Sequence, residues 1–112
     1  MLRDQILNAS DVRVEPVEVP EWGLTLYVRT LSIREVGELQ KLARQVDEAD
    51  RVSLVPQLVC RSACDQQGNR IFGHDDAEAL AEKNPAALAR VADAAAKING
   101  LAPDSVDHAG NA

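Results

Sequence analysis

The sequence predicts a mainly helical fold of the α+β class, in which an N-terminal antiparallel β-hairpin is followed by three to four packed α-helices. Three observations lead to this prediction. Apolar and polar residues alternate only near the N-terminus, with the period of a strand. Apolar residues then recur at helical spacing along the rest of the chain. Strand and helix patterns do not alternate with each other, so the class is α+β and not α/β.

The hairpin is predicted from two neighbouring stretches of alternating residues. In residues 12–19 valines alternate with charged residues, and Pro16 shifts the phase, which indicates an edge strand or a bulge. In residues 24–29 the alternation of apolar and polar residues is unbroken. Pro20–Gly23 supply the connecting turn between the two strands. A single helical turn over Leu2–Leu7 is expected to precede the hairpin.

Four helices are predicted after the hairpin, at Ile33–Asp47, Ser53–Cys64, Asp75–Glu82 and Pro85–Ile98. Ser32 and Glu35 have the spacing of a capping box, which predicts the start of the first helix. Asn84 before Pro85 is a strong start signal for the last helix, and Asn99-Gly100 is expected to end it. Residues 48–51 form a charged break, and residues 65–72 a polar loop with at most a short extended piece.

The length and charge of the chain limit its possible functions. With 112 residues it fits one domain, and we expect residues 1–101 to form that domain and residues 102–112 to be a disordered tail. Eighteen acidic residues against twelve basic ones give a net charge of −6, so we expect no nucleic-acid partner. The same charge balance argues against binding to an anionic membrane surface, and no stretch approaches the roughly 20 apolar residues of a membrane span, so we expect no membrane association. The first residues lack the apolar block of a secretory signal.

The residue types that carry catalysis or bind metals do not form a recognisable pattern. Cys60, Cys64, His74 and His108 do not have the spacing of a zinc site, and the turn at Gly68 lacks the acids of a calcium loop. No nucleophile with a base and an orienting acid, and no glycine-rich phosphate loop, can be identified. We therefore expect a protein that is not an enzyme and that needs no cofactor. Cys60 and Cys64 would share one helix face, where a disulfide is awkward, and we expect them to be reduced thiols.

Three segments together carry a family resemblance. They are Glu18–Gly23 (Glu-Val-Pro-Glu-Trp-Gly) with Leu26–Ser32 (Leu-Tyr-Val-Arg-Thr-Leu-Ser); Cys64–Phe72 (Cys-Asp-Gln-Gln-Gly-Asn-Arg-Ile-Phe) with Asp75, Asp76 and Leu80; and the closing residues Ala95, Ile98, Asn99, Gly100 and Leu101. In their order and spacing, which cover roughly Leu2 to Leu101, the chain resembles the tail assembly chaperones of long-tailed (siphovirus-type) bacteriophages and prophages.

The resemblance implies a non-enzymatic helper of tail assembly. Members of this family are expected to act in the cytoplasm of the infected bacterium and to be absent from the mature virion. They are thought to bind the tape-measure protein, to keep it soluble and to help recruit the subunits of the tail tube. The resemblance further implies a homo-oligomer, as a ring or spiral, and in many members a frameshift-extended product that contacts the tube subunits.

Six residues are predicted to contact a partner protein: Trp22, Val36, Leu39, Leu42, Leu88 and Val91. The apolar faces of the first and last helices could mask the apolar stripes of a tape-measure helix, and Trp22 is of a type enriched at interfaces. The alternative is that these residues are simply core. Two other functions are considered, a structural virion protein such as a tail completion factor and a small cytosolic regulatory or adaptor subunit.

Overall fold

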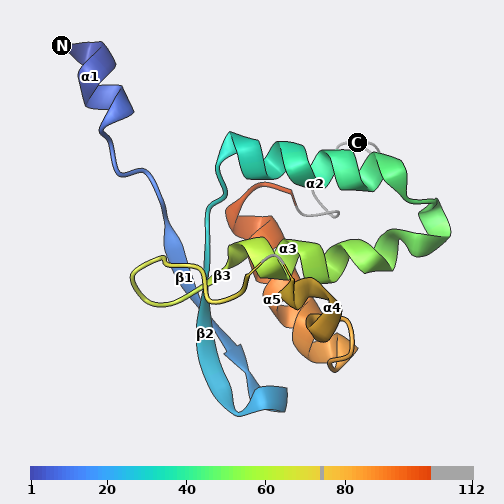
Figure 1. Ribbon diagram of the computed structural model, residues 1–112. Coiled ribbons are helices and arrows are strands. Elements are labelled where there is room, and N and C mark those ends of the chain that lie inside the picture. Colours follow the sequence, from blue (N-terminus) through green and yellow to red (C-terminus); the bar gives the residue numbers. More distant parts are fainter. Residues whose placement is uncertain (74, 102–112) are drawn as a thin grey trace, which may run out of the picture.

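The predicted α+β class is confirmed. The computed structural model describes residues 1–73 and 75–101, and Figure 1 shows a long β-hairpin beside a group of helices. The antiparallel strands lie in the order β1-β2-β3. The predicted tail at residues 102–112 lies outside the described residues, and so do both histidines, His74 and His108. None of the described helices is both long and apolar enough to cross a membrane.

The hairpin forms where the alternating pattern predicts it. β1 (Val14–Val19) and β2 (Leu24–Arg29) pair in unbroken antiparallel register, so Pro16 lies in an edge strand and not at a bulge. The connection is a 3₁₀ turn, Pro20–Trp22, followed by Gly23. Gly23 has φ 65°, a left-handed conformation that glycine adopts without a steric penalty.

The third strand corrects the predicted second helix. That helix, α3, begins at Leu54 and ends at Ser62, and Ala63–Cys64 form the short strand β3, which pairs with Tyr27 and Val28 of β2. Cys60 and Cys64 therefore do not share a helix face. The helical spacing of the two cysteines was misleading because pairing with a distant strand, which no local pattern reveals, decides the conformation of residues 63–64.

The remaining helices are α1 (Leu2–Leu7), α2 (Ile33–Gln45), α4 (Asp76–Leu80) and α5 (Pro85–Ile98). The capping box of Ser32 is present, and the Asn84 side chain accepts from the backbone N–H groups of Ala86 and Ala87. Three boundaries differ from prediction. α2 ends two residues early, the charged break is a 3₁₀ helix at Glu48–Ser53, and α4 spans only five residues.

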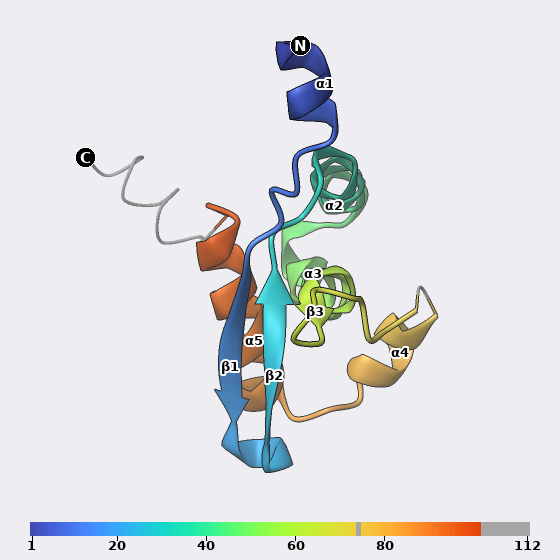
Figure 2. The same cartoon turned by 90° about the vertical axis from the view of Figure 1, so that its left-hand side faces the viewer.

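The core lies between the sheet, α3 and α5. Figure 2 shows α5 behind β1 and β2, with α3 beside them and α4 below α3. The fully buried side chains from these elements include Val19, Val28, Val59 and Val91. Alanines of α5 permit the close approach that a core poor in large residues requires. α1 and α2 stand outside this core, and none of their residues is buried.

Candidate protein-binding groove

Helix α2 presents an apolar face that the rest of the chain covers only in part. It lies alongside α3 in both views, on the side of α3 away from α4 (Figures 1 and 2). Val36, Leu39 and Leu42 on this face are half-buried, and Ile33 at the start of the helix is 88% exposed. An amphipathic helix in a small domain usually buries this face, so the partial exposure of α2 marks it as a candidate binding element.

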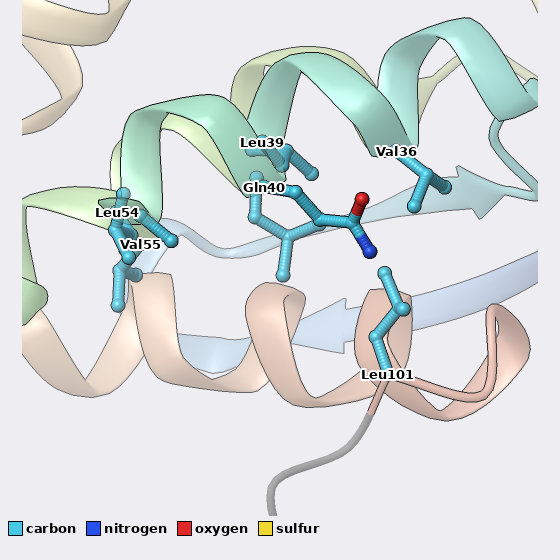
Figure 3. Close-up of a pocket in the computed structure, with 8 residues that line it drawn as sticks. Val36, Leu39, Gln40, Leu54, Val55 and Leu101 are labelled. Atoms are coloured by element: carbon cyan, nitrogen blue, oxygen red, sulfur yellow. The ribbon is translucent and has the colours of Figure 1, made fainter. Parts of the chain in front are cut away.

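An apolar groove of about 260 Å³ runs between α2 and α3 (Figure 3). Seven of its eight lining residues are aliphatic, and Gln40 is the polar exception. The lining residues are Val36, Leu39, Gln40, Ala43, Leu54, Val55, Leu58 and Leu101. Figure 3 shows Leu101, which follows α5, approaching Val36 and Gln40 from the opposite side. Aliphatic side chains at i, i+3 and i+4 positions of two adjacent helices form the kind of surface that accepts the apolar stripe of another helix.

Polar contacts fix the N-terminal half of α2, so the groove has a rigid end. The backbone N–H of Ser32 donates to Glu35 Oε1 (3.0 Å), and the backbone N–H of Glu35 donates to Ser32 Oγ (3.2 Å). Glu35 Oε2 also accepts from Arg29 Nη2 at 2.6 Å, in an ion pair whose side chains are only 12% and 14% exposed. The Glu35 carboxylate thus bonds both to the N-cap residue of α2 and to the last residue of β2. These contacts hold the N-terminal end of α2 in place.

The pKa of Glu35 reflects this environment. Partial burial works to raise it, but the hydrogen bonds from the Ser32 backbone and from Arg29 outweigh burial and hold the pKa of Glu35 below its ordinary value. The carboxylate is therefore charged at neutral pH. A second link lies one turn further along, where Arg61 Nε of α3 donates to Glu38 Oε1 at 3.1 Å. Together these contacts hold α2 beside α3 without filling the apolar space between them.

The structure separates the six predicted partner-binding residues into two groups. Val36 and Leu39 line the groove, Leu42 lies half-buried on the same helix, and Trp22 is half-buried against the edge of the core. Leu88 and Val91 are 5% and 0% exposed and belong to the core. Partner contact remains a prediction for all six, and for the last two it would require the core to open.

The sequence prediction omitted the side of the groove that α3 contributes. The available signal was the helical spacing of three aliphatic residues, Leu54, Val55 and Leu58. The same spacing fits a helix face that is fully buried, so it does not by itself indicate a groove. Leu101 follows Gly100, whose φ of 67° turns the chain at the end of α5. The position of Leu101 opposite α2 depends on that turn and on the packing of α5, so no local pattern could have identified it.

The remaining reactive side chains do not point to a chemical site. Cys60 and Cys64 are free and buried, and burial raises the pKa of both thiols, which disfavours the reactive thiolate. The Cys60 thiol donates to the Gly73 carbonyl at 2.9 Å. Across residues 1–73 and 75–101, no three His, Cys, Asp or Glu side chains are grouped as metal ligands.

Comparison with known proteins agrees with the fold and adds a family. A family model described as phage tail assembly chaperone matches residues 1–111. No curated protein matches the chain. Among solved structures, that of the bacteriophage HK97 tail assembly chaperone is similar, with a TM-score of 0.65 and 22% identity over 87% of this chain and 92% of the other. At that identity, the structural likeness shows a shared fold.

Proposed function

The chain belongs to the phage tail assembly chaperone family, and we propose that it acts in tail assembly by holding an apolar helical stripe of the tape-measure protein in the groove between α2 and α3. The role is non-enzymatic, since the chaperone masks a surface and changes no covalent bond. Masking keeps the long tape-measure helix soluble until the tail tube encloses it.

The observation that supports this proposal is the unfilled aliphatic groove beside a rigidly anchored helix. A tape-measure protein is expected to be a long helix with exposed apolar stripes, which aggregate unless they are covered. The groove offers apolar contact from two helices with a single amide, Gln40, in its lining, so it suits an apolar stripe better than a charged ligand. The net charge of −6 would help a chaperone–cargo complex to stay in solution.

Two further parts of the role rest on the family and belong to the same proposal. The chaperone would help recruit tail-tube subunits, through a frameshift-extended product where one is made. It would also act in the cytoplasm of the host bacterium and be absent from the mature virion. Mass spectrometry of purified phage particles and of infected-cell lysate tests the location. Finding the polypeptide in the particles in stoichiometric amounts would favour a structural virion protein instead.

The direct test co-expresses the chain with its cognate tape-measure protein and measures how much of that protein is soluble and co-purifies. We expect the unaltered chain to raise both quantities. Leu39→Asp places a charge in the groove and should reduce co-purification at least tenfold, because the charge would have to be desolvated against apolar cargo. If the unaltered chain neither co-purifies with the tape-measure protein nor raises its solubility, the proposed partner is wrong.

Gly37→Asp is the matched control for the groove. Gly37 lies about 200° around α2 from Leu39, on the exposed face, and a side chain added there meets nothing within 4 Å. The variant therefore adds the same charge to the same helix outside the groove and should bind cargo as the unaltered chain does. Equal loss of binding in both variants would mean that the charge of α2 matters and that the groove does not.

A further inference from the structure

A second apolar hollow continues the groove at one of its ends. It has a volume of about 590 Å³ and is lined by the 3₁₀ helix Glu48–Ser53, the start of α3, the segment after α4 and the start of α5. Val55 lines both the groove and this hollow. Figure 3 places Leu54 and Val55 at one end of the groove and Leu101 at the other, so the second hollow opens at the end away from Leu101. We call the groove and the second hollow together the apolar path.

The walls of the second hollow are apolar and exposed to solvent. Val52 is 75% exposed, and Ala81, Pro85 and Ala89 are exposed as well. Apolar side chains that face water in the folded chain gain free energy when a partner covers them. The second hollow therefore offers the same kind of surface as the groove, and it offers more of it.

The apolar path carries one charge. Among the described residues that line it, Lys83 is the only charged one, and Gln40 and Ser53 are the other polar ones. Lys83 is exposed, and within residues 1–73 and 75–101 it forms no ion pair. It lines the second hollow and not the groove, so the positive charge lies beyond the Val55 end of the groove. An ammonium group in this position attracts a carboxylate of a partner and disfavours another cation.

The apolar path runs along α5. Leu101, at one end of the path, follows the last turn of α5, whereas Pro85 in the second hollow is the first residue of that helix. The 14 residues of α5 rise about 21 Å, at 1.5 Å per residue. A partner helix that lies along the path thus meets apolar surface over about four turns, which the groove alone does not provide.

We propose that the apolar path receives one amphipathic cargo helix of about four turns, whose apolar stripe ends in an aspartate or glutamate that pairs with Lys83. This inference rests on the proposed function and adds to it the length, the charge and the direction of the bound segment. Lys83 lies at one end of the path only, so the acid fixes which way the cargo helix runs. A segment with a basic residue at that place would put two cations together and would be rejected.

The first test measures the binding of overlapping peptides that span the cognate tape-measure protein, each of about 25 residues, to the full chain by fluorescence anisotropy. We expect the peptides that bind to carry an apolar stripe with an acid at one end. Lys83→Glu should raise their Kd at least fivefold at about 50 mM NaCl, and less at about 500 mM, because salt screens the repulsion. Lys41→Glu makes the same charge change at an exposed position that lines neither hollow, and it should stay within about twofold.

The second test changes the apolar wall. Val52→Asp should raise the Kd of the same peptides about tenfold, because the carboxylate would lose its water against an apolar stripe. Val12→Asp is the matched control, since Val12 is 50% exposed, precedes β1 and lines neither hollow. It should stay within about twofold of the unaltered chain. Circular dichroism should show both variants folded, because both valines are exposed.

The third test exchanges the charges. In the peptide that binds most tightly, the acid at the end of the stripe is replaced by lysine. We expect this peptide to bind the Lys83→Glu chain more tightly than the unaltered chain, which reverses the order seen with the parent peptide. Binding that Leu39→Asp abolishes but that Lys83→Glu and Val52→Asp leave unchanged would overturn this inference and keep the groove as the cargo site. If no peptide binds the unaltered chain, the proposed function is wrong, and this inference is wrong with it.

Discussion

Helices α2 and α5 have nearly the same length and the same amphipathic character, yet only one of them is buried. α2 has 13 residues and buries none, whereas α5 has 14 and buries six, which are four alanines, Leu88 and Val91. The difference comes from position. α5 lies between the sheet and α3, so its apolar stripe meets neighbours on both sides, while α2 is an outer helix beside α3.

This comparison separates residues that hold the fold together from residues that remain available for binding. Burial of the α5 stripe contributes directly to stability, because its side chains are almost fully withdrawn from water. The half-exposed stripe of α2 contributes less to stability and leaves part of its apolar surface exposed, as the proposed binding of cargo requires. The proposed function needs both kinds of helix, since a surface that stabilises the fold by being buried cannot also receive cargo.

A Leu→Ala substitution in α5, compared with the same substitution in α2, gives the largest expected change in the free energy of unfolding. Leu88→Ala in α5 should lower the free energy of unfolding by about 2–5 kcal/mol, because Leu88 is only 5% exposed and its loss leaves a cavity. Leu39→Ala in α2 should cost less than about 1.5 kcal/mol, because Leu39 is half-buried and water already reaches the groove. Urea unfolding followed by circular dichroism measures both. Equal losses would show that α2 is as much a part of the core as α5.

Sequence patterns predicted the elements whose signals are local. Ser32 with Glu35, Asn84 with Pro85, and Gly23 with the preceding proline turn each fix a boundary through contacts within a few residues, and the structure has all three. The β3 strand was missed because its conformation depends on pairing with Tyr27 and Val28, far away in the sequence.

The exposure of a helix face could not be predicted in the same way. Leu39 and Leu88 each lie on the apolar stripe of an amphipathic helix. The sequence near either residue does not reveal which other element covers it. The sequence did not predict the groove itself, and of the residues that line it only Val36 and Leu39 were named as partner contacts. Its other half comes from α3 and from Leu101, which are placed by the tertiary packing of α3 and α5.

Asn99, at the end of α5, bonds to the segment between β2 and α2, and its substitution gives the next largest expected loss of stability. Its Oδ1 accepts from the backbone N–H of Leu31, just before α2, at 2.7 Å, and its Nδ2 donates to the Arg29 carbonyl at 3.2 Å. Asn99→Ala should cost about 2 kcal/mol, because two partly buried backbone groups lose their partner. Thermal and urea unfolding measure the loss. Lys97→Ala, an exposed change in the same turn of α5, should stay within about 0.5 kcal/mol. An equal loss there would show that any truncation at the end of α5 lowers the stability and that the hydrogen bonds of Asn99 are not the cause.

Substitution of Glu35 gives the smallest expected loss of stability, and this loss depends on pH. Glu35→Gln should cost about 1 kcal/mol at pH 7, because the ion pair with Arg29 is lost while the amide keeps part of the cap. The pKa of Glu35 is lowered in the folded protein, so its stabilising contribution is fully present above the ordinary value of about 4.5 and is lost as the pH falls through the folded pKa. The unfolding free energies of the unaltered protein and the variant should therefore converge below about pH 4.5, as measured by urea unfolding from pH 7 to pH 3. Parallel curves over that range would show that the polar end of α2 is not what holds this outer helix in place, and the contrast with α5 would then rest on apolar packing alone.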